Sequence, residues 1–331
     1  MHWKRKCASV PGESSTHRTR IFAVVVLYKQ PPSASMTIAT LARALRENHS
    51  VDCYVQIWDN SPSGEISLAE LPEGFRYHPA PVNGGLYAAY EGGRVFARTE
   101  GIGSSGYDWL LTLDQDTALP ADFFFAIEPG LRAAKADPRI GVIVPHLAEG
   151  ERLLSPAYVG LSRTKPMPAS FAGVPAREPR AFNSAALLRV EALDDIGGFD
   201  PCFWLDHLDS WLHHQLYVHG WRMYVLDSVH LEHHFSLLNY KDRVSLAHLR
   251  NFLAAESAYF DLYGSPLAGA GHTLQLAGRL VKQALRRETR EVRRATWNAL
   301  WQRLTVAKSK RVAAWRGSMG GSPGAKPGGN C

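Results

Sequence analysis

Short apolar runs alternate with helical patterns from Ile21 onward, and this alternation predicts a sheet covered by helices. The runs predict strands at Ile21–Tyr28, Cys53–Trp58, Phe75–His78, Trp109–Leu113 and Ile140–Val144. Between them, the pattern predicts a helix capped by Ser33, a helix over Leu86–Arg98 and a helix that starts at Pro120. Strands separated by helices indicate βαβ units, and therefore an α/β fold with a mostly parallel sheet. Ligands bind outside the carboxyl ends of the strands in such sheets, so polar residues at those ends are the candidates for a site.

The same pattern divides the chain into four parts. Residues 1–20 and 317–331 lack an apolar period, and we expect a disordered lead-in and a disordered tail. Residues 21–240 carry the strands of the expected α/β domain, and residues 241–316 form a basic helical extension. Within the domain, Glu149–Arg180 is rich in Pro, Ser, Gly and Arg, which predicts a long functional loop.

Composition is that of an ordinary globular protein, with 45% hydrophobic and 21% charged residues among 331. Four scattered cysteines suit reduced thiols in a cytosol better than a disulfide framework. No stretch reaches the roughly 18 apolar residues of a membrane-spanning helix. We therefore expect a cytoplasmic protein.

Charge is unevenly distributed. Between Thr273 and Arg316 there are twelve Lys or Arg and two Glu, so this segment has a net charge of +10. The whole chain has a net charge of +6, so the rest of the chain carries −4. Basic helices with interspersed Leu and Trp suit an anionic membrane surface, which would make the protein peripheral on the inner face of the cytoplasmic membrane. A helix packed on the domain with a solvated basic face is the alternative. Binding to a nucleic acid is disfavoured, because the rest of the chain is acidic and no recognition motif is present.

Two carboxylates one residue apart, Asp114 and Asp116, end the predicted strand Trp109–Leu113. At a strand end, this spacing can bring both acids to one divalent cation whose octahedron is completed by substrate phosphates. A turn or a helix cap would explain the same residues.

Polar residues follow other predicted strands as well. Asp59 follows the second strand and could accept hydrogen bonds from a nucleobase or ribose, although Asp-Asn-Ser-Pro also favours a simple turn. Asn83-Gly84-Gly85 opens a helical run, where a backbone without side chains allows close approach to a ligand or forms a plain turn.

Further along, Asp206 and Asp209 stand three apart in an aromatic and apolar setting that includes Trp204. Desolvation would raise the basicity of such a carboxylate and suit it to general-base catalysis, whereas an acidic first turn of a helix is the structural alternative. A histidine-rich stretch follows at positions 213, 214, 219, 230, 233 and 234. Without a nearby cysteine it does not specify a zinc site, so we expect mostly structural histidines and one metal ligand among them.

Taken in order, these segments resemble the family-2 inverting glycosyltransferases of the GT-A fold, over roughly Ile21 to Ser236. The matching segments are the opening strand through Tyr28, Asp59-Asn-Ser, Asn83-Gly-Gly, Asp114-Gln-Asp116, Phe182-Asn183-Ser184-Ala185, Gly197-Gly-Phe-Asp200 and the segment around Asp209. The form Leu-Asp206-His-Leu-Asp209 is closest to the bacterial dTDP-rhamnosyltransferase branch. Departures include Lys29 in place of a common Asn, Leu208 in place of Glu, and Ser236 in place of a Gly.

The resemblance implies an enzyme that moves a sugar, L-rhamnose in that branch, from a nucleoside diphosphate to a hydroxyl of a glycan or lipid-linked acceptor in cell-surface polysaccharide synthesis. It implies that Asp209 is the catalytic base and that Mg²⁺ or Mn²⁺ binds Asp114, Asp116 and His233. The implied donor-binding residues are Tyr28, Asp59, Asn83, Gly84, Gly85 and Asp114, and those on the acceptor side are Asn183, Ser184, Trp204 and Asp206.

Other functions remain open. A UDP-sugar donor would use the same site. A metal-dependent nucleotidyltransferase or phosphohydrolase could use similar diphosphate chemistry, but Lys29-Gln-Pro-Pro supplies little of the basic loop it would need. The basic extension could also bind a polyanion by charge alone.

Overall fold

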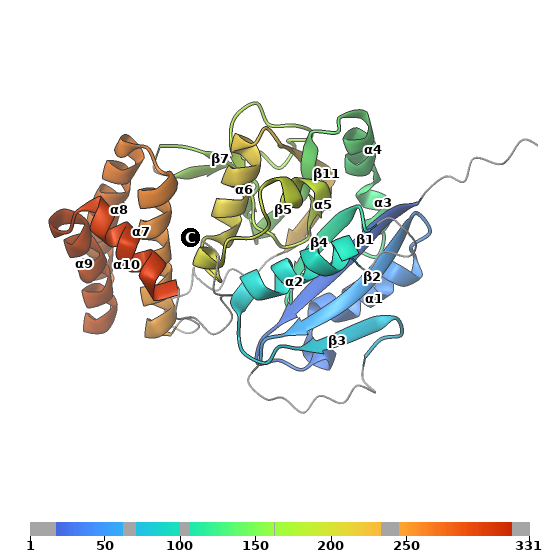
Figure 1. Cartoon of the computed structure of the whole chain (residues 1–331), viewed down its shortest axis with the longest axis horizontal. Coiled ribbons are helices and arrows are strands. Elements are labelled where there is room, and N and C mark those ends of the chain that lie inside the picture. Colours follow the sequence, from blue (N-terminus) through green and yellow to red (C-terminus); the bar gives the residue numbers. More distant parts are fainter. Residues whose placement is uncertain (1–17, 62–70, 100–105, 162, 233–244, 320–331) are drawn as a thin grey trace, which may run out of the picture.

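The computed structural model describes residues 18–61, 71–99, 106–161, 163–232 and 245–319 (Figure 1). The strands are β1 (Thr19–Leu27), β2 (Val51–Asp59), β3 (Phe75–Pro79), β4 (Trp109–Asp114), β5 (Ile140–Glu149), β6 (Arg152–Ser155), β7 (Ala157–Val159), β8 (Thr164–Pro166), β9 (Pro179–Arg180), β10 (Ala186–Arg189) and β11 (Arg222–Glu232). The α-helices are α1 (Met36–Arg46), α2 (Gly85–Thr99), α3 (Phe123–Ala126), α4 (Glu128–Ala136), α5 (Val190–Asp195), α6 (Leu208–Val218), α7 (Leu246–Tyr263), α8 (Pro266–Leu285), α9 (Arg290–Thr305) and α10 (Lys308–Met319).

Eight strands form one sheet in the order β11-β5-β10-β4-β1-β2-β3, with β6 paired to β5. The pairs around β1 and β2 and the pair β11–β5 are parallel, whereas β10 runs antiparallel between β4 and β5. The expected mostly parallel sheet is therefore present, and β10 is its antiparallel insertion.

Helices cover both faces of this sheet, and the alternation of side chains along β1 shows how. Ile21 and Val25 point to a core shared with α1, α3 and α4. Phe22 and Val24 point to the opposite core, shared with α2, α5 and α6. Successive strand residues face opposite sides, so a strand with a helix layer on each face reads as one continuous apolar run.

Several element boundaries differ from the sequence prediction. The first strand begins at Thr19, inside the expected lead-in, and α10 continues to Met319, past the start of the expected tail. Ser35 caps α1 in place of the expected Ser33, because Pro32–Ala34 first form a 3-10 turn. The helix expected at Pro120 is two short helices, α3 and α4. The predicted domain boundary at residue 240 lies outside the described residues.

The segment 149–180, which was expected to be a long loop, is not structureless. It contains β6, which extends the main sheet, and a second sheet in the order β8-β7-β9. These short strands gave no clear period in the sequence, because only one residue of β7 is buried and all of β8 is exposed.

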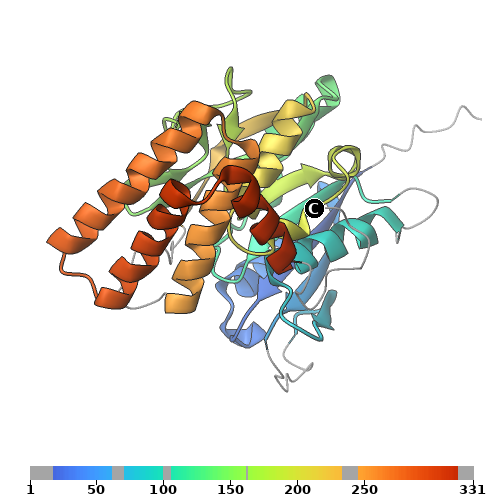
Figure 2. The same ribbon diagram turned by 60° about the vertical axis from the view of Figure 1, so that its left-hand side comes forward.

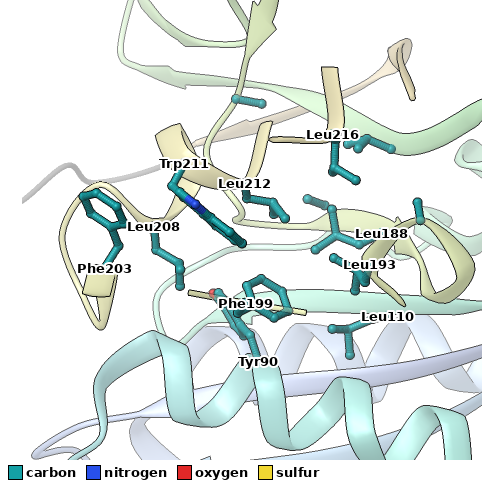
Figure 3. Close-up of a cluster of buried hydrophobic side chains, with 14 of the residues drawn as sticks. Tyr90, Leu110, Leu188, Leu193, Phe199, Phe203, Leu208, Trp211, Leu212 and Leu216 are labelled. Carbon is teal, nitrogen blue, oxygen red and sulfur yellow. The ribbon is translucent and has the colours of Figure 1, made fainter. Parts of the chain in front are cut away.

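Helix α6 is fixed by the core between the sheet and α2. Figure 3 shows Leu208 and Trp211 of α6 directed at Tyr90 and Phe199. Trp211 is 5% exposed and Tyr90 is fully buried. This packing holds the first turn of α6, which carries Asp209, against the sheet.

The four C-terminal helices pack on the domain. Tyr259 of α7 stacks on His207, with ring centroids 5.7 Å apart, and Trp315 of α10 lies 6.2 Å from Phe203. Helices α8 and α9 pack beside α7 and form the end of the molecule away from the sheet (Figures 1 and 2). No described helix has the length and apolarity needed to cross a membrane.

Candidate active site

A cavity of about 920 Å³ opens where β1 and β4 end, and it collects most of the predicted site residues. Its wall includes Tyr28, Asn83, Gly85, Asp114, Asp116, Trp204, Asp206 and Asp209. These residues come from four separate segments of the chain, which the parallel strands and the first turn of α6 bring to one place. Helix α7 of the extension supplies a further wall.

The two carboxylates that end β4 differ in their surroundings. Asp114 is half-buried: its Oδ1 accepts a hydrogen bond from the Tyr90 hydroxyl at 3.3 Å, and its Oδ2 accepts one from the Ser184 hydroxyl. Asp116 is exposed to the cavity. Thr37 fixes the turn between them. Its hydroxyl donates to the Asp114 carbonyl and accepts the Thr117 N–H at 2.8 Å. Asp114 is thus a fixed carboxylate and Asp116 an accessible one.

The Asp114–Asp116 pair fits one class of divalent cation. Magnesium-like cations bind through one or two carboxylates and take the remaining ligands from water and substrate phosphates. Among the described residues, no group of three or more His, Cys, Asp or Glu could hold a metal ion. Asp114 and Asp116 are therefore suited to a cation shared with a phosphate-bearing substrate. His233, the third predicted ligand, lies outside the described residues.

Asp209 lies in the first turn of α6 and lines the same cavity. Burial, together with the negative charges of Asp114 and Asp206, raises its pKa to about 7, although the Asn183 N–H and Arg180 act in the opposite direction. Its Oδ1 is inaccessible to solvent and has no hydrogen-bond partner among the described residues. A carboxylate with such a pKa and an unused oxygen can accept a proton near neutral pH.

The glycine segment opposite has a steric role. Gly85 has φ +65, and a Cβ there would lie 2.3 Å from the Trp204 carbonyl oxygen. Asn83 Oδ1 accepts the Gly85 N–H at 3.0 Å, and the Trp204 carbonyl accepts the Tyr87 N–H at 3.0 Å. The segment is both a turn and a point of close approach, and it sets Trp204 and Asn83 on the cavity wall. Gly84 does not line the cavity.

Asp206 connects the domain to the extension. Its Oδ1 lies 3.1 Å from His248 Nε2, and its Oδ2 accepts the Asn251 amide at 2.5 Å. Asp206 raises the pKa of His248 by this hydrogen bond. Both oxygens of this 8%-exposed residue are therefore occupied in holding α7 against the cavity.

Arg180 is a site residue that the sequence reading missed. It lines the cavity, and its Nη2 donates to the Tyr259 hydroxyl at 2.7 Å. Lys29 adds a second cation to the wall. The only sequence signal was that Arg180 ends the segment 149–180, which was expected to be a functional loop. Its proximity to Asp209 depends on the small sheet, which the sequence did not reveal.

Three predicted residues lie behind the cavity wall. Asp59 is 2% exposed, and its oxygens accept the Tyr77 hydroxyl at 2.6 Å and the Ser61 N–H at 2.8 Å. Its neighbour Asn60 lines the cavity in its place. Ser184 supports Asp114, and the Asn183 backbone N–H supports Asp209. Asn183 and Ser184 each contact a carboxylate of the site, and neither residue lines the cavity.

The described histidines of the His-rich stretch have structural contacts. His214 Nδ1 lies 2.9 Å from Glu178, and His219 and His230 bond backbone carbonyls. His213 is buried, and burial lowers its pKa to about 3. These four residues form no metal site, in line with the expectation that most would be structural.

Comparisons with known proteins were made for sequence and for structure. No family model and no curated protein matches the sequence. Among solved structures, the chain is similar to GalNAc-T7 with UDP, GalNAc and Mn²⁺, with a TM-score of 0.53 and 13% identity, over 91% of this chain and 58% of that one. It also aligns with S. aureus TarS, with a TM-score of 0.46 and 12% identity, over 91% of this chain and 48% of that one. The chain thus spans about half the length of these two structures.

The likeness to GalNAc-T7 establishes the fold. The chain has the GT-A glycosyltransferase fold, a Rossmann-like mostly parallel sheet with helices on both faces, followed by a C-terminal helical extension. The predicted fold class is confirmed.

Proposed function

We propose that the chain is an inverting glycosyltransferase that transfers a sugar from a nucleoside diphosphate to an acceptor hydroxyl. The observation that carries the proposal is one cavity, at the strand ends of a GT-A sheet, that joins the Asp114–Asp116 pair to Asp209, whose pKa is about 7. Asp114 and Asp116 suit a cation that is bound to a diphosphate, and Asp209 suits proton removal from a hydroxyl. Lys29 and Arg180 add positive charge to the wall, which favours an anionic donor.

In the proposed reaction, Asp209 accepts the proton of the acceptor hydroxyl as that oxygen bonds to the anomeric carbon. The bond from this carbon to the diphosphate oxygen breaks, and the electron pair leaves with the diphosphate. A single displacement inverts the anomeric configuration. When bound at Asp114 and Asp116, Mg²⁺ or Mn²⁺ supplies positive charge that stabilises the departing diphosphate. GalNAc-T7, which shares the fold, was solved with UDP and Mn²⁺, and this supports the donor class and the metal.

The donor we propose is dTDP-L-rhamnose, because Asp206 and Asp209 keep the form of the rhamnosyltransferase branch. The acceptor we propose is a glycan or a lipid-linked glycan, and the place of action is the cytoplasm. Tyr28, Asn60 and Asn83 lie on the wall nearest the carboxyl ends of β1 and β2, which supports a nucleotide subsite there.

Donor binding is tested by thermal unfolding with a panel of nucleoside diphosphates and nucleotide sugars, with and without Mn²⁺. At a concentration 100 times the Kd, the ligand should stabilise the folded chain by about 2.7 kcal/mol. Replacement of Asp116 by Ala should abolish the part of the shift that needs Mn²⁺, because it removes the accessible carboxylate ligand. A shift with UDP compounds in place of dTDP compounds would retain the transferase and replace the donor. The absence of any nucleotide-dependent shift would contradict the proposal.

The pH dependence of kcat/KM should show an acid limb set by Asp209, since a protonated carboxyl cannot accept the hydroxyl proton. Activity should fall as pH falls through its pKa. A cation on Asp114 offsets the repulsion from that residue, so the midpoint of the loaded enzyme should lie below the value of about 7 of the bare site. Arg180→Met removes a charge that lowers the Asp209 pKa and should move the midpoint to higher pH, whereas Arg180→Lys should remain closer to the parent. If the pH profiles of kcat/KM for Arg180→Met and the parent coincide, Asp209 does not set the acid limb.

A further inference from the structure

A set of large apolar side chains on α8 and α9 is at least half exposed. Its members are Leu267, Leu274, Val281 and Leu285 of α8 and Trp297, Trp301 and Leu304 of α9, each between 50% and 80% exposed. They are seven of the fifteen large hydrophobic side chains that are exposed in the described residues. Clustered exposed apolar residues of this kind mark interaction surfaces, whereas isolated ones need no explanation.

We call this set of seven residues the outer face of the helix pair. On α8 they recur at steps of seven, seven and four residues, and on α9 at four and three, so each set follows one line along its helix. The two helices contact each other through other residues, since the Gln283 amide donates to the Thr296 hydroxyl at 3.0 Å. Helix α8 also packs on α7, where His272 stacks on Phe260 at 4.5 Å. None of the seven residues lines the catalytic cavity, and α8 and α9 lie at the end of the molecule away from the sheet (Figure 2).

Basic residues border and continue this face. Arg290 and Arg294 extend the line of Trp297 and Trp301, and Lys282, Arg286 and Arg287 are exposed at the end of α8. The extension also places arginines in internal ion pairs, Arg279 with Glu256 and both Arg303 and Arg311 with Asp261. No ion pair found among the described residues includes Arg286, Arg290 or Arg294. The outer face therefore presents positive charge beside its apolar side chains.

We infer that the outer face of α8 and α9 binds the surface of an anionic phospholipid bilayer. Trp and Leu enter the boundary between headgroups and acyl chains, and Arg and Lys remain at the headgroups. The stacked pair Trp297–Trp301, with ring centroids 5.9 Å apart, presents two such side chains together. A second copy of the chain is a poorer occupant, because it would bring the same positive charges face to face. The inference does not rest on the proposed function, since the outer face is separate from the cavity.

The test is flotation of the full chain with vesicles of phosphatidylcholine alone or mixed with phosphatidylglycerol. We expect binding to the anionic vesicles that weakens as salt is raised, and little binding to the neutral ones. The double variant Trp297→Ser and Trp301→Ser should lose about tenfold or more in affinity, because a buried indole contributes strongly at the interface. Phe125→Ser is the matched control: Phe125 is 71% exposed, but it lies on α3 of the sheet domain, and its loss should leave vesicle binding unchanged.

Two further measurements exclude other occupants. Arg290→Gln with Arg294→Gln should reduce both the affinity for anionic vesicles and its salt dependence. Light scattering should show the same mass for the parent and the Trp double variant. A parent that fails to bind anionic vesicles, or equal binding by the Trp variant, overturns the inference. A dimer that the Trp substitutions dissociate, without vesicle binding, assigns the outer face to a second copy instead.

Discussion

Replacement of Asp209 by Asn should lower kcat by about 10²- to 10⁴-fold, the usual contribution of a general base. The carboxamide has nearly the shape of the carboxylate and can still accept the Asn183 N–H, but it cannot take a proton from a hydroxyl. The fold should not suffer. Burial disfavours the ionised form of Asp209, so above pH 7 the neutral variant should be at least as stable as the parent. Steady-state kinetics and thermal unfolding check the two expectations.

The control for this variant is its affinity for the donor in the presence of Mn²⁺. This affinity should stay within about twofold of the parent's. Asp206→Asn is the matched substitution on the same wall. Asp206 is occupied by His248 and Asn251, so its loss should affect thermal stability more than the chemical step. If Asp209→Asn abolishes nucleotide binding along with turnover, the role of Asp209 is structural.

Replacement of Asp261 by Asn should destabilise the helical extension by about 3–5 kcal/mol, the cost of removing one partner from a buried ion pair. Asp261 of α7 is 4% exposed and bonds two arginines, Arg303 at 3.1 Å and Arg311 at 2.8 Å. The Arg303 side chain is also 4% exposed, and burial lowers its pKa, so this carboxylate stabilises a buried positive charge. Denaturant unfolding monitored by hydrogen exchange in α7 and α9 checks the prediction.

Asp137→Asn provides the comparison. Asp137 pairs with Arg222 at 2.6 Å, but the two side chains are 30% and 53% exposed, and a solvent-screened pair contributes about 1 kcal/mol or less. Equal losses in the two variants would contradict the buried-pair argument. Because α7 lines the cavity, Asp261→Asn should also lower the temperature at which activity is lost, whereas Asp137→Asn should not.

Local sequence pattern was sufficient for the sheet and for part of the site. The strand that ends in Asp114 was predicted from five apolar residues, and the register of β4 on β1 places that end at the edge of the sheet. Gly85 was found because Asn83-Gly84-Gly85 opens a predicted helical run, and Asp209 because it stands in an aromatic and apolar setting that resembles the family's catalytic segment. Their predicted roles stay predictions until the variants are measured.

The sequence did not reveal where side chains turn once the chain is folded. Asp59 was expected on the cavity wall, but Tyr77, eighteen residues away on β3, draws its carboxylate inward. Ser33 was the expected cap, but Ser35 caps the helix, and its hydroxyl donates to the Gln115 carbonyl, eighty residues away. Such choices depend on partners that are close only in the folded state.

What the sequence by itself determined is the α/β fold, the strand ends and the acids placed there, because strand and helix periods are local and carboxyl ends of parallel strands share one edge. What only the tertiary structure decided is the rest of the cavity: Arg180 beside Asp209, and His248 and Asn251 of α7 on Asp206. It likewise decided which basic residues of the extension are used internally and which remain on its outer face. The physical reason is that these contacts join residues tens of positions apart, and their energies depend on burial and distance, which no local pattern encodes.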